Sequence, residues 1–300
     1  MKPNYPHLAT RLFNVPLAIT PGKIEVVMAA LADRFGLARL FRADGDMVML
    51  LDDDEDDFDM GDAADERPYR VVEGIAVIPV LGTLVQKLGC LHPYSGMTGY
   101  DGIRANLSMA LADSTVRAIV LDIDSPGGEV AGCFDLVDAI YDARGTKPVW
   151  AILSECAYSA AYALASACDM VTVPRTGGTG SVGVIVAHVD FSQALASQGI
   201  TVTLITSGVR KGDGNEFQPL ADEARAAIQA DVNEVAELFF ATVARNRGLP
   251  ASKLRAAQGA TFLGGAGVAA GLADAVMSPD EALYTLYSSL QQEAETSWAT

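Results

Sequence analysis

Two residues of this chain, Ser159 and Lys211, have the chemistry of a nucleophile and a general base. Ser159 stands in the run A-Y-S-A-A-Y, and Lys211 stands in S-G-V-R-K-G-D-G. A serine hydroxyl becomes an acyl-transfer nucleophile when a neighbouring base takes its proton. A lysine serves as that base when it is desolvated enough to lose its charge near neutral pH. The pair therefore predicts acyl transfer of the kind performed by serine peptidases with a Ser–Lys dyad.

A glycine turn upstream of both residues can supply the backbone donors that this chemistry needs. The run V-L-D-I-D-S-P-G-G-E-V predicts a buried strand that breaks at a turn and leads into a helix. Glycine permits backbone angles closed to other residues and lets a substrate approach closely. The N–H of Gly127 or Gly128 can therefore point toward an oxyanion, and the N–H of Ala160, directly after Ser159, is the second candidate donor. The structural alternative is a tight turn without a chemical role.

The side chains of this group also have structural interpretations. Ser159 can be a simple N-cap of the helix predicted in S-A-A-Y-A-L-A-S, and most loop lysines are solvated and keep their charge. Among the neighbouring serines, Ser154 falls just after a predicted strand and Ser166 inside the predicted helix, so Ser159 is better placed. Ser181, in T-G-S-V-G-V, is a candidate hydroxyl partner for a neutral Lys211 amine.

Two other motifs in the same region are alternatives to the dyad. Gly178, Gly180 and Gly183 spell G-x-G-x-x-G, but the strand-like run V-I-V-A-H-V follows where a dinucleotide site needs a helix. A Ser–His–Asp triad would use His188 and Asp190, but no G-x-S-x-G elbow accompanies them. His188 lies in an apolar strand pattern, which favours a packed, hydrogen-bonded histidine.

The hydrophobic pattern from residue 69 onward predicts an α/β fold. β-branched apolar runs alternate with helical periods, which is typical of crossover helices on a mostly parallel sheet. The expected strands are 71–80, 116–123, 148–153, 170–173, 182–189 and 201–206, and the expected helices are 103–111, 130–141 and 219–247.

Composition divides the chain before this domain. Helical spacing of apolar residues predicts a short helix within 24–42, and the run at 52–66 is dense in acids, which is typical of a solvated linker. We expect an N-terminal helical appendage at 1–51, an acidic linker at 52–68, a peptidase domain at 69–290 and a tail at 291–300. A calcium site in the linker is the alternative, but Asp57 stands where the EF-hand loop requires glycine.

Charge and cysteine content exclude several classes of protein. The net charge of −17 argues against a nucleic-acid surface. The four cysteines show no metal-ligand spacing and no disulfide framework, so we expect free thiols, no metal and no cofactor. The N-terminus lacks the apolar stretch of a signal peptide, and no run is long enough for a membrane helix. We therefore expect a cytoplasmic protein.

The order of the motifs resembles the signal peptide peptidase A family of serine peptidases. The resemblance covers about residues 70–278 and runs through D-S-P-G-G, S-A-A-Y, G-S-V-G-V and S-G-V-R-K. It implies a fold related to the Clp protease and the crotonases, with Ser159 as nucleophile and Lys211 as base. The chain departs from the family pattern at Ala160 and Ala161, where glycine is usual. Alanine retains the N–H that an oxyanion hole needs.

Within that family the chain is most similar to the lambda-type phage capsid-assembly proteases. P-Y-S-G-M-T-G-Y-D-G-I, K-P-V-W-A and K-G-D-G-N carry this likeness. It implies head maturation inside the procapsid, with scaffold, portal or the protease itself as substrates, small residues near the scissile bond, and a ring-like homo-oligomer. The alternatives are a housekeeping peptidase for released signal peptides and a non-catalytic scaffold- or portal-binding module of the same fold.

Overall fold

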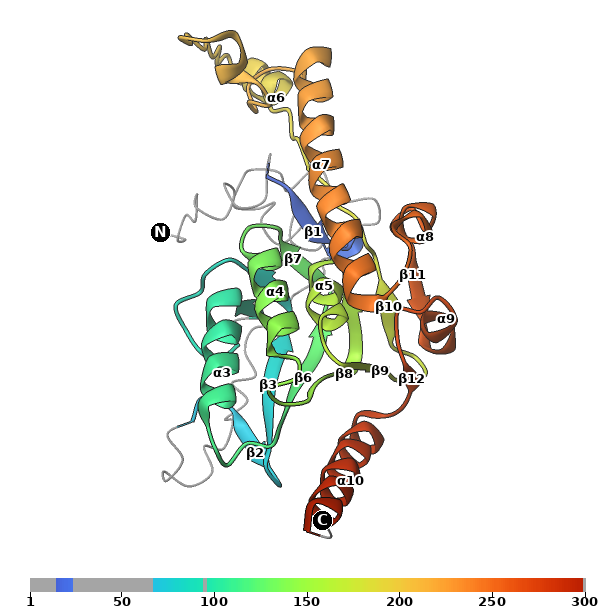
Figure 1. Ribbon diagram of the computed structural model, residues 1–300. Coiled ribbons are helices and arrows are strands. Elements are labelled where there is room, and N and C mark those ends of the chain that lie inside the picture. Colours follow the sequence, from blue (N-terminus) through green and yellow to red (C-terminus); the bar gives the residue numbers. More distant parts are fainter. Residues whose placement is uncertain (1–14, 24–66, 94–95, 299–300) are drawn as a thin grey trace, which may run out of the picture.

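The computed structural model describes residues 15–23, 67–93 and 96–298, the last six of these without side-chain detail. Figure 1 shows them as a body of strands and helices from which one segment projects. The helix predicted within 24–42 and the acidic linker at 52–66 lie outside the described residues. Residues 15–23 fall within the expected N-terminal appendage, yet they contain a strand, β1 (Leu17–Ile19), that belongs to the body. Three residues are too few to show a periodic pattern, so this strand could not be predicted.

The main sheet is mostly parallel, as predicted. Its strand order is β11-β10-β8-β6-β3-β2, and β9 and β12 continue from β8 on a second path. Only β2 and β11 pair antiparallel with their neighbours. The strands are β2 (Arg70–Val72), β3 (Ile75–Leu81), β6 (Ala118–Ser125), β8 (Val149–Tyr158), β9 (Met170–Val173), β10 (Gly178–Gly180), β11 (Thr261–Leu263) and β12 (Ala275–Val276).

A second, four-stranded sheet lies beside the residues that the sequence singled out. Its order is β1-β7-β4-β5, with β4 (Thr83–Val85), β5 (Met97–Gly99) and β7 (Gly127–Glu129). β4 pairs in parallel with β5 and β7, whereas β1 pairs antiparallel with β7.

Helices cover both faces of the main sheet. Because alternate residues of a strand point to opposite faces, Ile119 and Leu121 of β6 pack in the larger core with α3, α4 and α5, while Val120 packs in a smaller core with α10. α3, α4 and α5 lie side by side in front of the strands in Figure 1. The helical elements are α3 (Tyr100–Ala112), α4 (Cys133–Ala143), α5 (Ala160–Ser166), α6 (Ser192–Ser197), η1 (Val209–Gly212), α7 (Asp222–Arg247), α8 (Ala251–Ala256), α9 (Gly264–Ala269) and α10 (Pro279–Trp298).

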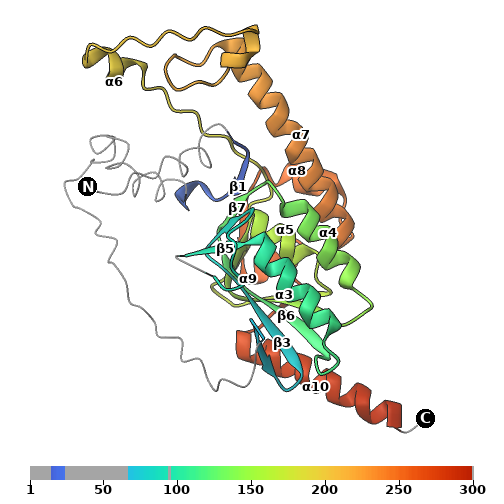
Figure 2. The ribbon, with the colours of Figure 1, turned by 90° about the vertical axis from the view of Figure 1, so that its left-hand side faces the viewer.

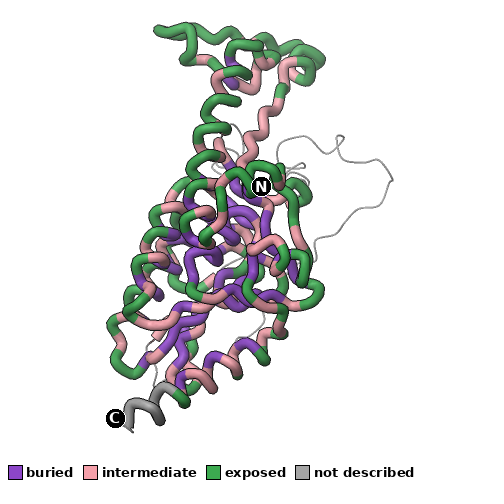
Figure 3. The backbone as a smooth tube through the Cα atoms, turned by 45° about the vertical axis from the view of Figure 1, so that its right-hand side comes forward, coloured by how far each residue is buried: buried purple, intermediate pink, exposed green. Residues whose placement is uncertain are grey.

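Residues 190–220, which we call the arm, project from the body together with the first turns of α7. Figures 1 and 2 show α6 and the start of α7 at the far end of this projection, away from α5. Helix α6 has no buried residue, and the arm is mostly exposed in Figure 3. Helix α7 ends as predicted at Gly248, which has φ 63°. Its fully buried apolar contacts, at Phe239 and Val243, lie in the half that crosses the body.

Three of the predicted strands were wrong in whole or in part. The strand expected at 71–80 is two antiparallel strands, β2 and β3, because a turn at Glu73 and Gly74 reverses the chain. The runs at 182–189 and 201–206 form no strand in the described chain, apart from isolated bridging near Ile185. Both runs have β-branched residues, but a strand also needs a partner for its N–H and C=O groups. Apart from the bridging near Ile185, neither run meets such a partner in the part of the chain that the structure describes.

Candidate active site

Ser159 occupies a strained turn between β8 and α5. Its backbone has φ 54° and ψ −118°, a conformation that residues with a Cβ rarely adopt. Two backbone hydrogen bonds hold it: the Ser159 N–H donates to the Gly180 carbonyl at 2.8 Å, and the Ser159 carbonyl accepts the Ala163 N–H at 2.9 Å. Strain of this kind persists where surrounding structure enforces it, and it is concentrated at functional sites.

The Ser159 hydroxyl does not cap the helix. α5 begins at Ala160 with no side-chain cap hydrogen bond, so the simple N-cap interpretation was wrong. The residue is 1 % exposed, and its Oγ contacts the Gly183 carbonyl at 3.4 Å, the outer limit of a hydrogen bond. The structure thus presents a nearly buried hydroxyl with one weak partner.

The competing serines are engaged elsewhere. The Ser154 hydroxyl donates to the Asp122 carboxylate. Ser166 lies inside α5, where its hydroxyl donates to the Ala163 carbonyl at 2.7 Å and accepts the Asn246 amide at 3.0 Å. Both hydroxyls are thus hydrogen-bonded, whereas the Ser159 hydroxyl has one weak partner.

The glycine turn lies directly against Ser159. A Cβ on Gly127 would stand 3.0 Å from the Ser159 Cβ and 2.2 Å from the Ala18 carbonyl oxygen, and Gly127 has φ 99°. A Cβ on Gly128 would stand 1.9 Å from the Leu84 carbonyl oxygen. Only glycine fits at these two positions, because the neighbouring atoms are largely backbone atoms that cannot move aside.

The N–H groups of this turn are not directed at an empty site. The Gly127 N–H donates to the Ser125 hydroxyl at 3.2 Å, and that hydroxyl donates to the Gly82 carbonyl at 2.6 Å. Gly128 is paired in register with Ala18 on one side and with Leu84 on the other. Ser125 is a residue whose positioning role sequence reasoning missed, although it stands within the S-P-G-G run.

Ser181 lies next to Ser159 because their strands are in register. β10 pairs in parallel with the end of β8, so that Gly180 faces Tyr158 and the two serines follow at adjacent positions. Ser181 also has φ 54°, and its N–H donates to the Ala260 carbonyl at 2.9 Å. β6, β8 and β10 are neighbouring strands, so the glycine turn, Ser159 and Ser181 all come from strand ends at one edge of the sheet. Ligand sites of open α/β sheets lie at such edges.

Lys211 is not brought to this edge within a single chain. It lies in η1 on the arm, its side chain is exposed, and its N–H donates to the Gly208 carbonyl at 3.0 Å. No hydrogen bond links its amine to Ser159 in the part of the chain that the structure describes. Figures 1 and 2 place the arm well beyond α5 in both views.

The alternative triad is not assembled either. A ring nitrogen of His188, Nε2, contacts the Asn215 carbonyl at 3.1 Å, and Asp190 accepts the Ser192 N–H at 2.8 Å. These are local contacts at the base of the arm, in keeping with the packed histidine that the sequence favours.

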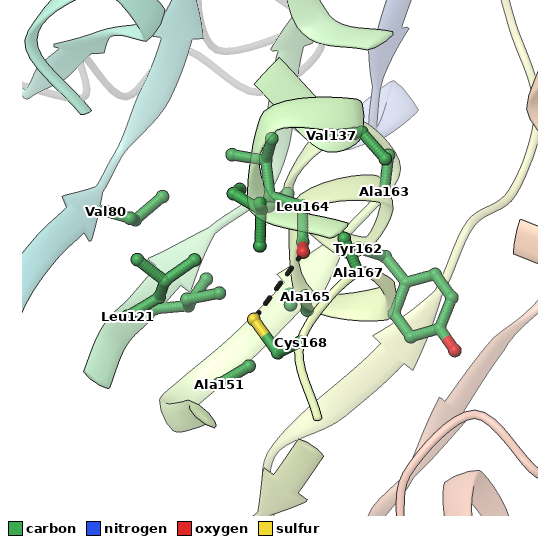
Figure 4. Close-up of a cluster of buried hydrophobic side chains, with 14 of the residues drawn as sticks. Val80, Leu121, Val137, Ala151, Tyr162, Ala163, Leu164, Ala165, Ala167 and Cys168 are labelled. Atoms are coloured by element: carbon green, nitrogen blue, oxygen red, sulfur yellow. Dashed lines mark hydrogen bonds between the residues drawn. The ribbon is translucent and has the colours of Figure 1, made fainter. Parts of the chain in front are cut away.

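Helix α5 fixes Ser159 through dense packing of small residues. Every residue from Ala160 to Ser166 is buried, and Figure 4 shows the helix enclosed by side chains from β3, β6 and α4. The Tyr162 hydroxyl donates to the Leu272 carbonyl at 2.9 Å. Burial raises the pKa of the Tyr162 phenol and of the Cys168 thiol, so both remain neutral and contribute packing.

All four cysteines are free thiols, as expected from their spacing. Among residues 15–23, 67–93 and 96–298, no three His, Cys, Asp or Glu side chains are grouped as metal ligands would be. None of the helices in those same ranges combines the length and apolar character that crossing a membrane requires.

The chain has an α/β fold with a mostly parallel sheet. It belongs to peptidase family S49, whose model matches residues 142–293. The chain is 43% identical over 298 residues to the "head-tail preconnector protein GP5" of Enterobacteria phage P21, covering 97% of this chain and 58% of that protein. It is 39% identical over 296 residues to the "capsid assembly protease C" of Escherichia phage lambda, covering 96% of this chain and 66% of that protein. More distantly, 190 residues are 25% identical to a "putative signal peptide peptidase SppA" of Enterococcus faecium, covering 63% of this chain and 54% of that protein. The chain thus spans about three fifths to two thirds of the length of the two phage relatives.

Proposed function

We propose that the protein is a serine endopeptidase that matures a phage head, with Ser159 as its nucleophile. One observation carries the proposal: Ser159 is held in a strained turn at the carboxyl edge of the sheet, its hydroxyl does not cap the helix, and Gly127 lies against its Cβ. Membership of peptidase family S49 supports the chemistry. The lambda relative, a capsid assembly protease, supports the biological setting.

In the proposed reaction the neutral Lys211 amine takes the Ser159 proton while the serine oxygen attacks the peptide carbonyl. The oxyanion would accept hydrogen bonds from the Ala160 N–H and from the N–H of Gly127 or Gly128, which must first leave the partner that it has in this structure. The protonated lysine then gives its proton to the leaving amine. Water, activated by the same amine, hydrolyses the acyl-enzyme. Ser181 would accept a hydrogen bond from the lysine ammonium or donate one to the neutral amine.

This dyad requires the arm to meet a serine turn, which it does not do within one copy. The arm exposes large apolar side chains, with Ile205 93% and Val209 95% exposed. Large apolar side chains that are this exposed are typical of an interaction site. We therefore propose a homo-oligomer in which the arm packs against a neighbouring copy, where burial would favour the neutral form of the amine.

The proposed substrates are proteins of the procapsid: scaffold, portal and the protease itself. The proposed site of action is the interior of the procapsid in the host cytoplasm. The proposed mechanism requires no metal or cofactor.

Fluorophosphonate labelling followed by peptide mass spectrometry tests the nucleophile. We expect an adduct on Ser159 in the wild type, none in Ser159→Ala, and wild-type labelling in Ser154→Ala, which removes the neighbouring serine hydroxyl. Lys211→Met should reduce labelling strongly, whereas Arg210→Met on the same arm should not. Labelling that is absent from the folded wild type, or that is equal in Ser159→Ala, refutes the proposal.

A mixing experiment tests whether the dyad forms between copies. Ser159→Ala supplies an intact lysine and Lys211→Met an intact serine, so a mixture regains cleavage of scaffold protein only if the arm acts on a neighbour. Each variant alone should be inactive. A mixture that stays inactive, while wild type diluted with either variant remains active, shows that the arm folds back onto its own chain.

A further inference from the structure

Strand β1 lies between two backbone segments that flank Ser159. On one side it pairs antiparallel with β7, with Ala18 facing Gly128 and Ile19 facing Gly127. On the other side Leu17 pairs antiparallel with Ile185: the Leu17 N–H donates to the Ile185 carbonyl at 2.8 Å, and the Ile185 N–H donates to the Leu17 carbonyl at 2.9 Å. A three-residue segment is thus bonded along both of its edges.

β1 and its two flanking segments all lie close to the serine. The Ala18 carbonyl oxygen and the Ser159 Cβ both lie within 3.0 Å of one point, the place where a Cβ on Gly127 would stand. The Ser159 hydroxyl contacts the carbonyl of Gly183, two residues before Ile185. β1 therefore runs across the candidate nucleophile, with its backbone close to the atoms that a scissile peptide must approach.

The geometry points to the strip between β7 and residues 183–185 as the site that receives an extended substrate peptide, and to Leu17–Ile19 as its occupant in the resting chain. This inference rests on the proposed function and deepens it. Adding a strand to exposed backbone edges is a general mode of peptide recognition, in which main-chain hydrogen bonds give affinity and alternate side chains give specificity. Here a bound segment can pair with two backbone edges at once, that of β7 and that of residues 183–185.

The occupant indicates what class of segment the site takes. Leu17, Ala18 and Ile19 are 3%, 1% and 5% exposed, so all three side chains are enclosed. Leu17 and Ile19 project to one side and Ala18 to the other. The site therefore suits an extended segment with apolar residues at alternate positions and a small residue between them.

The occupant is also built to be short. Pro16 and Pro21 stand on either side of β1, and proline has no N–H to extend a ladder. Beyond β1, the Thr20 N–H donates to the Pro126 carbonyl at 3.0 Å. A substrate can therefore replace β1 if it offers the same few backbone hydrogen bonds and fills the space of the three buried side chains.

Proline substitution in the full chain tests the occupancy. Leu17→Pro removes the N–H that bonds Ile185, while Val15→Pro places a proline just outside β1 as the matched control. Fluorophosphonate should label Ser159 about tenfold faster in Leu17→Pro than in wild type, because the apparent rate rises with the fraction of open sites. Val15→Pro should label like wild type. A synthetic peptide of sequence N-V-P-L-A-I-T-P-G, residues 14–22, should slow labelling of Leu17→Pro.

A measurement without catalysis separates this inference from the proposed chemistry. In a Ser159→Ala chain, the same peptide should raise amide hydrogen exchange in residues 17–20 and leave residues 127–129 and 185 protected, since the peptide takes the place of β1. If the peptide does this but Ser159 is never labelled in any variant, the chemistry is wrong and the strand site stands. If Ser159 is labelled equally in wild type and Leu17→Pro, or if residues 17–20 stay protected at every peptide concentration, the inference is wrong and the peptidase remains.

Discussion

Replacing Gly127 by alanine separates the two demands that the structure makes at this position. The first demand is conformational, since φ is 99° there, and the second is steric, since the new Cβ would stand 2.2 Å from the Ala18 carbonyl oxygen and 3.0 Å from the Ser159 Cβ. Gly145 provides the matched control: it has φ 80° in an exposed turn, and no atom lies within 4 Å of its ideal Cβ.

The two variants should therefore differ by the steric contribution alone. A left-handed conformation costs a residue with a Cβ about 1–2 kcal/mol, which both variants share. Overpacking against atoms that cannot move aside costs a further ~1–3 kcal/mol, which only Gly127→Ala incurs. We expect the free energy of unfolding of Gly127→Ala to be lower than that of Gly145→Ala by about that second amount.

Urea unfolding monitored by fluorescence measures the stability difference, and fluorophosphonate labelling of Ser159 reports the local effect. Gly127→Ala should lose most of its labelling under conditions where it is folded, because relief of the 3.0 Å contact with the Ser159 Cβ displaces the serine turn. Gly145→Ala should label like wild type. Equal midpoints and equal labelling in the two variants would show that Gly127 does not pack against Ser159, and the description of the site would be wrong.

Three further outcomes test the surrounding structure. Burial works to raise the pKa of Asp101, but hydrogen bonds from three backbone N–H groups, at 3.0 to 3.2 Å, hold that pKa below 3.8. The stability that this carboxylate contributes is therefore present above pH 3.8 and is lost as the pH falls through the lower folded-state value. The difference in urea midpoint between wild type and Asp101→Asn should accordingly shrink below about pH 4. Arg247→Met leaves the bidentate partner Asp274 without its guanidinium (2.7 and 3.0 Å) and should lower the free energy of unfolding by about 2–3 kcal/mol, with less than additive loss when Asp274→Asn is combined. Burial and the neighbouring Asp124 raise the pKa of Cys156 to about 12, so in the folded chain iodoacetamide at pH 8 should modify this half-exposed thiol far more slowly than in urea, and rapid modification would contradict that environment.

Much of the body was predictable because its elements carry their own signals. β6 and β9 fall on the apolar runs expected at 116–123 and 170–173, and α7 spans the helical period that ends at Gly248. The meeting of the glycine turn, Ser159 and Ser181 also follows from local order. Parallel strands bring their carboxyl ends to one edge, so three motifs that each follow a strand must gather there.

What the sequence did not predict depends on partners distant in the chain. β1 pairs with β7 and with Ile185 through backbone hydrogen bonds, which do not depend on side-chain type and so cannot be predicted from it. The run T-V-T-L-I-T at 201–206 has strong strand propensity, yet Leu204 and Ile205 are exposed and unpaired in strand structure, since propensity cannot supply a second strand. The position of Lys211 was unpredictable for the same reason, because the residues around it do not specify what η1 packs against.

The exposed arm and the occupied strip together imply that a single copy of the chain is held inactive in two independent ways. Among the described residues no base lies beside the Ser159 hydroxyl, and the proposed peptide site contains β1. The proposed oligomerisation would bring a base to Ser159, and an arriving substrate segment would displace β1. Reactivity would therefore require both an assembled neighbour and a competing strand. A protease confined with its substrates at high local concentration meets both conditions, because the effective concentration of copies and of extended segments rises together. Dilute protein meets neither, so the same two features that permit cleavage in a crowded assembly suppress it outside one.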